Sequence, residues 1–209
     1  PWRLAVARDL AFGFIYPHQL VRWRRQGLAV DFFSPLADDA PNSRADGLFL
    51  PGGYPELYLP ALARARHFRR GVAQLAARNK IVYGECGGYM MLGRSITNAA
   101  GRAYPALDLL PVSTSFAAPR LTLGYRVMEP QQRHLSIAQQ HFLRQVMGDG
   151  AMTLQGHEFH YCTERMADQP TRPLFRAFDA NHQPLPSLGG ESMAGAVHGS
   201  VMGSFLHVI

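Results

Sequence analysis

A cysteine set among glycines is the residue in this sequence best placed to do chemistry. Cys86 stands in Gly84-Glu85-Cys86-Gly87-Gly88, between the short apolar run 81–83 and the apolar residues 89–92. This is the G-x-nucleophile-x-G pattern of a strand-to-helix turn, with cysteine in the place of serine. Such a turn lifts the nucleophile above the end of a sheet, and its glycines let the backbone pass closely. The pattern indicates a thiol nucleophile; a buried structural cysteine in a glycine-rich turn is the alternative.

The expected surroundings of Cys86 would stabilise negative charge. The Gly87 amide points at the oxygen on which charge develops, and a helix that begins there favours a thiolate and an oxyanion. A second glycine turn, Leu50-Pro51-Gly52-Gly53-Tyr54-Pro55-Glu56, follows another apolar run. Loops at the carboxyl ends of strands in an α/β sheet converge on one crevice. We therefore expect Gly52, Gly53 and Gly87 to bind substrate, with Gly53 and Gly87 as the two oxyanion donors. The alternative is an ordinary turn that closes a strand.

A cysteine nucleophile needs a base within hydrogen-bond reach, usually a histidine. Five of the nine histidines lie in stretches typical of helix surfaces or loops: His18, His67, His134, His141 and His182. The other four lie in or near apolar, strand-like segments: His157, His160, His198 and His207. His207 follows the apolar run 201–206, which places it at the end of a strand or just beyond it. We interpret His207 as the candidate base.

The segment Gly156-His157-Glu158-Phe159-His160 invites a metal-site interpretation. Its spacing differs from the H-E-x-x-H pattern of helical zinc sites, and on a strand His157 and His160 point to opposite faces. Glu158 and His160 share a face, so we expect them to support the site by orienting a ligand or forming a structural pair. We expect no metal site in this chain.

A phosphate-binding loop of the form G-x-x-x-x-G-K-[ST] is missing from the sequence. Its only lysine, Lys80, does not adjoin a glycine-rich turn. We therefore expect this chain to need no cofactor and not to hydrolyse ATP by itself.

Short apolar runs alternate with helical stretches in the first half of the chain. Predicted strands cover 4–7, 29–33, 47–50 and 81–83, and predicted helices cover 18–26, 60–78 and 89–92. This alternation indicates an α/β fold with a mostly parallel central sheet flanked by helices. In the second half we predict strands over 121–128, 153–162, 173–178 and 194–207 and a helix over 136–147. Because the sequence has no repeat and no linker, residues 1–209 are expected to form one domain.

Composition supports a globular protein. The chain has 209 residues, of which 47% are hydrophobic and 17% charged, so it has ample apolar surface to bury and is neither a disordered tail nor a coiled coil. Its net charge of +6 would suit an acidic ligand or nucleic acid. The arginines are spread along the chain apart from one helix-like stretch, so we expect a solvated helix face there and no nucleic-acid partner.

Cysteine content and hydropathy indicate the compartment. Cys86 and Cys162 are too few for a disulfide framework and lack C-x-x-C spacing, which favours free thiols in a reducing environment. No run approaches the ~18 apolar residues of a membrane span, and charged residues interrupt the N-terminal stretch. We expect a cytoplasmic protein without a membrane partner.

These motifs together resemble the glutaminase domain of class I (triad-type) glutamine amidotransferases. The resemblance is to the branch at the C-terminus of cobyrinic acid a,c-diamide synthase and its hydrogenobyrinic acid counterpart in cobalamin biosynthesis. It covers nearly the whole chain. Its motifs, in order, are Ala5-Val6-Ala7-Arg8-Asp9, Phe32-Phe33-Ser34-Pro35-Leu36-Ala37-Asp38, Leu50-Pro51-Gly52-Gly53-Tyr54-Pro55-Glu56-Leu57, Glu85-Cys86-Gly87-Gly88, Gly156-His157-Glu158-Phe159-His160-Tyr161 and Gly203-Ser204-Phe205-Leu206-His207.

The resemblance implies a flavodoxin-like fold and glutamine hydrolysis through a cysteinyl thioester. Cys86 would attack the glutamine side-chain amide, the Gly53 and Gly87 amides would stabilise the oxyanion, and His207 would shuttle the proton. In the family, ammonia passes to an N-terminal synthetase domain that uses ATP and Mg to activate and amidate the a and c acetates of the corrin. We interpret the chain, which starts at Pro1, as a fragment of such an enzyme, partnered by that domain in cis or in trans.

Three departures from the general class stand out. The class carries His-x-Glu, whereas Ile209 follows His207 by two residues, so the resemblance implies a Cys-His dyad of weaker or partner-dependent activity. Met90 stands where the class favours glutamine, four residues after the nucleophile. The sequence also ends shortly after His207, so we expect a frayed last strand and a poorly held base.

Other functions remain open. The chain could serve another tetrapyrrole amidotransferase, such as cobyric acid synthase or a nickel-sirohydrochlorin diamide synthase. It could be a non-catalytic docking domain of the same fold, which the intact Cys86 and both glycine loops disfavour. It could also be a cysteine hydrolase or chaperone with a similar elbow, which would not need His207.

Overall fold

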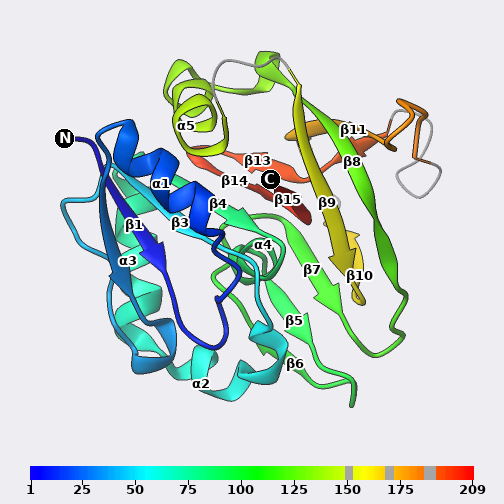
Figure 1. The fold of residues 1–209 in the computed structure, drawn as a ribbon. Coiled ribbons are helices and arrows are strands. Elements are labelled where there is room, and N and C mark those ends of the chain that lie inside the picture. Colours follow the sequence, from blue (N-terminus) through cyan, green and yellow to red (C-terminus); the bar gives the residue numbers. More distant parts are fainter. Residues whose placement is uncertain (149–152, 168–171, 186–191) are drawn as a thin grey trace.

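The computed structural model describes residues 1–148, 153–167, 172–185 and 192–209 of the chain (Figure 1). A six-stranded sheet in the order β13-β14-β4-β3-β1-β2 forms its centre. All neighbouring pairs are parallel except β13-β14, at one edge. The strands are β1 (Arg3–Ala7), β2 (Ala29–Phe33), β3 (Gly47–Leu50), β4 (Ile81–Glu85), β13 (Ala196–His198) and β14 (Val201–Ser204). The predicted α/β fold with a mostly parallel sheet is confirmed.

Helices cover both faces of this sheet because successive strand residues point to opposite sides. Leu4 and Val6 of β1 belong to a core cluster with residues of α1 (Pro17–Arg25) and α5 (Ile137–Met147). Ala5 and Ala7 belong to a second cluster with residues of α2 (Leu59–Arg64), α3 (Arg66–Ala77) and α4 (Gly87–Leu92). Figure 1 shows α1 and α5 in front of the sheet and α3 behind it.

Two smaller sheets flank the centre. One has four strands in the order β10-β7-β5-β6: β5 (Ser95–Thr97), β6 (Ala103–Pro105), β7 (Val112–Ser115) and β10 (Thr163–Met166). The other has five in the order β12-β11-β8-β9-β15: β8 (Thr122–Pro130), β9 (Leu154–His160), β11 (Phe175–Phe178), β12 (Met193–Ala194) and β15 (Leu206–Val208). The predicted strands at 121–128, 153–162 and 173–178 correspond to β8, β9 and β11, and the predicted helix at 136–147 to α5. The four strands of the first of these sheets were not predicted.

The prediction of one helix over 60–78 is wrong. The chain leaves the helical conformation at Ala65, with ψ of 84°, and starts again as α3. The side chain of Asp38 causes the restart, because its Oδ1 accepts hydrogen bonds from the His67 and Phe68 amides at 2.7 and 3.0 Å. An N-terminal cap from a distant loop therefore divides a stretch that is periodic in the sequence.

The prediction of one strand over 194–207 is also wrong. Gly199, with φ of 56°, turns the chain between β13 and β14, and a second break at Phe205 separates β14 from β15. β14 pairs with β4 in the central sheet, whereas β15 pairs with β9 in the five-stranded sheet. The expected fraying is not found: His207 and Val208 are each 1% exposed.

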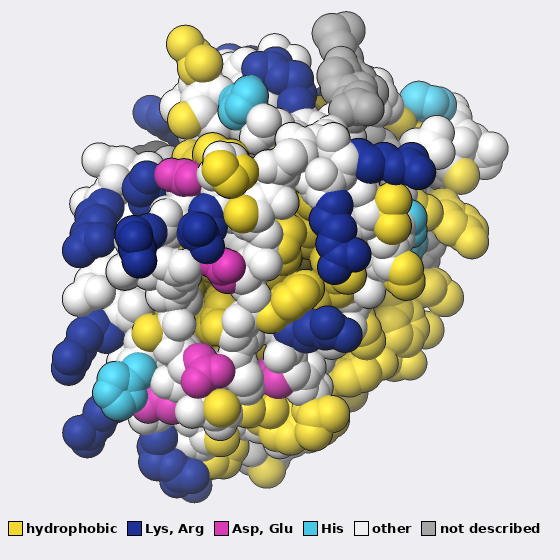
Figure 2. Space-filling model, turned by 60° about the vertical axis from the view of Figure 1, so that its left-hand side comes forward, with side chains coloured by type: hydrophobic (Ala, Val, Ile, Leu, Met, Phe, Trp, Pro, Cys, Tyr) yellow, Lys and Arg dark blue, Asp and Glu magenta, His cyan; other side chains and the backbone are white. Residues whose placement is uncertain are grey.

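Charged side chains on the surface do not gather into one patch on the face shown in Figure 2. Lys and Arg side chains are spread over the face shown in Figure 2, with acidic and hydrophobic side chains between them. None of the helices in the described residues is long and apolar enough to cross a membrane.

Gly88→Ala should test the packing that sets the elbow in place. A Cβ at Gly88 would overlap the Leu50 carbonyl of β3, so α4 would have to shift. We expect the free energy of unfolding to fall by about 3 kcal/mol, measured by urea denaturation. Gly13→Ala is the control, because its Cβ would lie 3.4 Å from the nearest atom, the Asp9 oxygen. Equal stability of both variants would contradict this account of the packing.

Candidate active site

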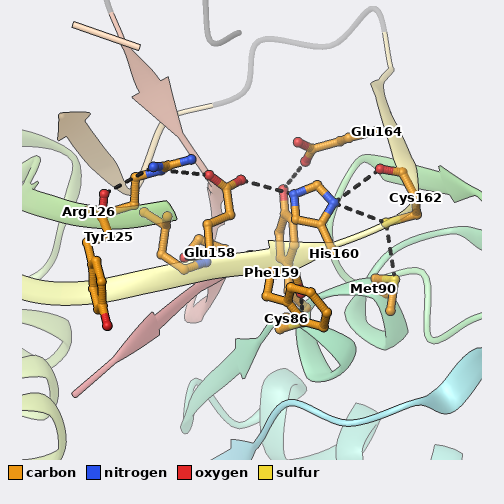
Figure 3. Close-up of polar contacts among 12 residues, drawn as sticks. Cys86, Met90, Tyr125, Arg126, Glu158, Phe159, His160, Cys162 and Glu164 are labelled. Atoms are coloured by element: carbon orange, nitrogen blue, oxygen red, sulfur yellow. Dashed lines mark hydrogen bonds and ion pairs between the residues drawn. The ribbon is translucent and has the colours of Figure 1, made fainter. Parts of the chain in front are cut away.

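Cys86 occupies a strained turn between β4 and α4. Its backbone has φ of 48° and ψ of −105°, outside the regions that non-glycine residues ordinarily adopt. The conformation is fixed on both sides, since the Cys86 amide donates to the Ser204 carbonyl at 2.8 Å and its carbonyl accepts from Met90 at 3.0 Å. This is the geometry predicted for a nucleophile elbow. Cys86 is 4% exposed, and its Sγ lies 3.8 Å from the Phe159 carbonyl (Figure 3).

The two glycine loops lie against each other. The Gly88 amide donates to the Pro51 carbonyl at 3.1 Å, and a Cβ at Gly87 would be 3.1 Å from the Gly53 nitrogen. Neither the Gly53 nor the Gly87 amide donates to another residue within the described ranges. The structure thus brings together the two predicted oxyanion donors, next to Cys86, with both N–H groups unused.

Gly52 has a different contact from the one expected. A Cβ at this position would overlap Cε1 of His207, so the imidazole lies directly on the Gly52 backbone. The Gly52 carbonyl accepts from the Phe14 amide at 3.0 Å. Glycine at this position is therefore explained by the close approach of the histidine.

His207 reaches Cys86 from β15. Its ring is within hydrogen-bond reach of the Cys86 thiol and stacks on His157, with 4.7 Å between ring centroids and 3° between planes. Burial by itself would lower the pKa of His207. Its contacts with Cys86 and Glu85 outweigh burial and raise that pKa to about 10. The contacts with Cys86 and Glu85 thus favour the protonated form of His207.

Sequence reasoning missed Glu85, the last residue of β4. Its side chain is completely buried, and its Oε1 lies 3.3 Å from His207 Nδ1. The general class carries its acid two residues after the histidine, where this chain has Ile209. The available signal was a glutamate next to Cys86 at the end of an apolar strand.

Glu158 and His160 form a buried pair, as their shared strand face predicts. Glu158 Oε1 lies 3.0 Å from His160 Nε2, and its Oε2 accepts from Arg126 Nε at 2.9 Å (Figure 3). Burial raises the pKa of Glu158, but His160 and Arg126 together lower it below its usual value. The His160 ring also stacks on Phe205 at 4.0 Å, beside the break that precedes β15.

A small pocket of about 30 Å³ opens at Cys86. Its wall is formed by Phe14, Gly53, Tyr54, Glu56, Met90, Phe116, Phe159, His160 and Tyr161. Glu56 Oε2 is buried there and has no hydrogen-bond partner among the described residues, and burial raises the pKa of this carboxyl to about 7. Met90, at the sequence position where the general class favours glutamine, lies in the wall of this pocket.

Cys162 is a second buried thiol with a different environment. Its Sγ lies 3.6 Å from Met90 Sδ, and burial together with nearby negative charges raises its pKa. Both cysteines are free. The described ranges contain no group of three or more His, Cys, Asp and Glu side chains able to hold a metal ion.

Solved structures share this fold. A glutamine amidotransferase from Thermotoga maritima aligns over 98% of this chain and 75% of its own with a TM-score of 0.57 and 16% identity. The PurLQS structure from Thermotoga maritima gives the same TM-score at 15% identity, over 98% of this chain and 86% of that one.

Sequence relatives are much closer. Hydrogenobyrinate a,c-diamide synthase from Brucella abortus is 49% identical over 207 residues, and the same-named protein from Rhodobacter capsulatus is 44% identical over 208. Each match covers 99% of this chain but 43% of the relative, so the chain spans less than half the length of these proteins. Residues 3–209 match the family described as the CobB/CobQ-like glutamine amidotransferase domain. The chain belongs to this family of glutamine amidotransferase domains.

Proposed function

We propose that this chain is the glutaminase domain of a hydrogenobyrinate a,c-diamide synthase. The observation that carries the proposal is the placement of Cys86 in a pocket with Gly53, next to the unused amides of Gly53 and Gly87 and in contact with His207. A non-catalytic docking domain would have no need of this arrangement. A cysteine hydrolase with a similar elbow would not need a buried histidine delivered by the last strand.

The reaction begins with the Cys86 thiolate attacking the side-chain amide carbon of glutamine. The carbonyl oxygen becomes an oxyanion, which accepts hydrogen bonds from the Gly53 and Gly87 amides. Its collapse breaks the carbon–nitrogen bond as the His207 imidazolium gives its proton to the departing nitrogen, which leaves as ammonia. Water then attacks the thioester while neutral His207 takes a proton from it, and glutamate and the thiolate are released.

The length and names of the relatives support a destination for the ammonia. They are more than twice as long as this chain, and their names state amidation of the a and c side chains of hydrogenobyrinate. We assign that step to an N-terminal synthetase domain, in cis or in trans, which binds the corrin and uses ATP and Mg to activate its carboxylates. Ammonia released from glutamine at Cys86 then attacks the activated carboxyl carbon, and the activating group leaves as the amide forms. A cytoplasmic location fits this work.

Glu56 supplies a site for the cationic end of glutamine. Its carboxylate lines the pocket with Cys86 and has no partner among the described side chains. Glutamine carries one positive group, the α-ammonium, and an ion pair would compensate the buried carboxylate. The Glu56 interaction would orient the substrate so that its side-chain amide reaches the thiol.

Labelling with a glutamine-mimicking diazo-ketone tests the nucleophile. We expect one adduct per chain on wild type and none on Cys86→Ser, measured by intact mass with and without the synthetase part. Cys162→Ser is the matched control and should label and hydrolyse glutamine like wild type, because burial raises the pKa of that thiol. Comparable losses in both variants would overturn the assignment, and no wild-type adduct under either condition would favour the docking-domain alternative.

Glu56→Gln should raise KM for glutamine about tenfold or more, with a smaller effect on kcat, because a charge-assisted contact to the ammonium is lost. In wild type, KM should also rise as pH falls through about 7, where Glu56 becomes protonated. That pH dependence should disappear in Glu56→Gln. Glu129→Gln, on β8, is the control; unchanged KM in Glu56→Gln would contradict the role.

A further inference from the structure

Glu85 is a buried acid that needs a compensating partner. It ends the buried strand β4, and an ionised carboxylate in such a place is unfavourable unless it is paired. Its Oε2 accepts from the Val208 amide at 3.3 Å. Its Oε1 lies 3.3 Å from His207 Nδ1, within ion-pair distance, and neither of these two buried atoms makes a hydrogen bond in the described ranges. These two atoms therefore face each other with no other polar partner among the described residues.

The path of the chain builds this pair. Glu85 lies opposite Ser204 in the parallel β4-β14 register. The break at Phe205 then turns the chain into β15, and the next two residues bring His207 to the side chain of Glu85. Because Glu85 also immediately precedes Cys86, one strand end supplies both the nucleophile and a carboxylate for its histidine.

We propose that Glu85 is a positioning residue that takes the place of the missing carboxylate at position 209. It holds Nδ1 of His207, so that the opposite ring nitrogen faces the Cys86 sulfur, and it stabilises the imidazolium. A carboxylate on Nδ1 fixes the tautomer and orientation of a catalytic histidine in the same way whichever segment provides it. The site is then a triad assembled from two adjacent residues and one distant residue, and the expectation of a dyad is replaced. This inference deepens the proposed glutaminase function and rests on it.

Other titratable groups face the pair from neighbouring elements. His157 of β9 stacks on His207 and, if protonated, opposes its positive charge; burial and His207 lower the pKa of His157. Tyr16 lies before α1, and burial followed by the charges of Glu85 and Cys86 raises its pKa to about 12. Besides the contact with Cys86, the contact with Glu85 is the one among these that raises the pKa of His207.

The first test measures His207 directly, with no dependence on glutamine. In wild type labelled with ¹⁵N-histidine, we expect the His207 Nδ1–H proton to resonate far downfield at neutral pH, identified by its loss in His207→Asn. In a Cys86→Ala background, adding Glu85→Gln should lower the pKa of His207 by about one unit or more. A His207 with unprotonated Nδ1 in wild type, or an unchanged pKa in the variant, would overturn the proposal.

The second test uses turnover. Glu85→Gln should lower kcat for glutamine hydrolysis by about 10²- to 10⁴-fold with KM little changed, and Glu85→Asp should restore part of the loss. Glu129→Gln is the control. A kcat within about threefold of wild type in folded Glu85→Gln would overturn the positioning role. If Glu85→Gln does not fold, the wild-type NMR measurement still decides. A paired Nδ1–H in a protein that the diazo-ketone does not label would contradict the glutaminase function while leaving the pairing intact.

Discussion

The left-handed backbone of Cys86 is the constraint on which the site depends. A non-glycine residue in that conformation costs roughly 1–3 kcal/mol, so the surrounding packing has to hold it. The neighbouring segments on either side do so, because Ser204 of β14 accepts from the Cys86 amide and Pro51, directly after β3, accepts from the Gly88 amide. The strands come close enough for this only where side chains are missing: a Cβ on Gly203 would overlap the Gly84 carbonyl. The glycines around the elbow thus permit the close packing of the strands, in addition to any contact with the substrate.

The second requirement is that the histidine come from another sheet. β14 is an inner strand of the central sheet, whereas β15, two residues further, is an edge strand of the five-stranded sheet. The buried network of Glu158, His160 and Arg126 fixes β9 against β8, and β9 in turn carries β15. Residues that looked like candidate ligands in the sequence therefore hold the strand that carries His207.

Local signals predicted the elbow, the first four strands of the central sheet and the helix that begins after Ser136, because glycine turns, apolar runs and caps act over a few residues. What the sequence could not predict depends on distant partners. Asp38, in the segment between β2 and β3, divides the helical stretch at Ala65, and the periodicity of that stretch contains no information about so distant a cap. The break at Phe205 depends on which sheet each half of the segment joins. The Glu85–His207 contact joins two residues that become neighbours only when the whole fold forms. The sequence comparison therefore implied a dyad of Cys86 and His207, without Glu85.

Trapping the covalent intermediate tests the central claim most directly. The chain is mixed with glutamine, quenched in acid on the millisecond timescale, and analysed by intact mass and peptide mapping. The account predicts a glutamyl thioester on the peptide that contains Cys86, formed before glutamate accumulates and missing in Cys86→Ser. Steady release of glutamate and ammonia with no adduct at any quench time would show that water attacks glutamine directly, and would contradict the role of the elbow cysteine.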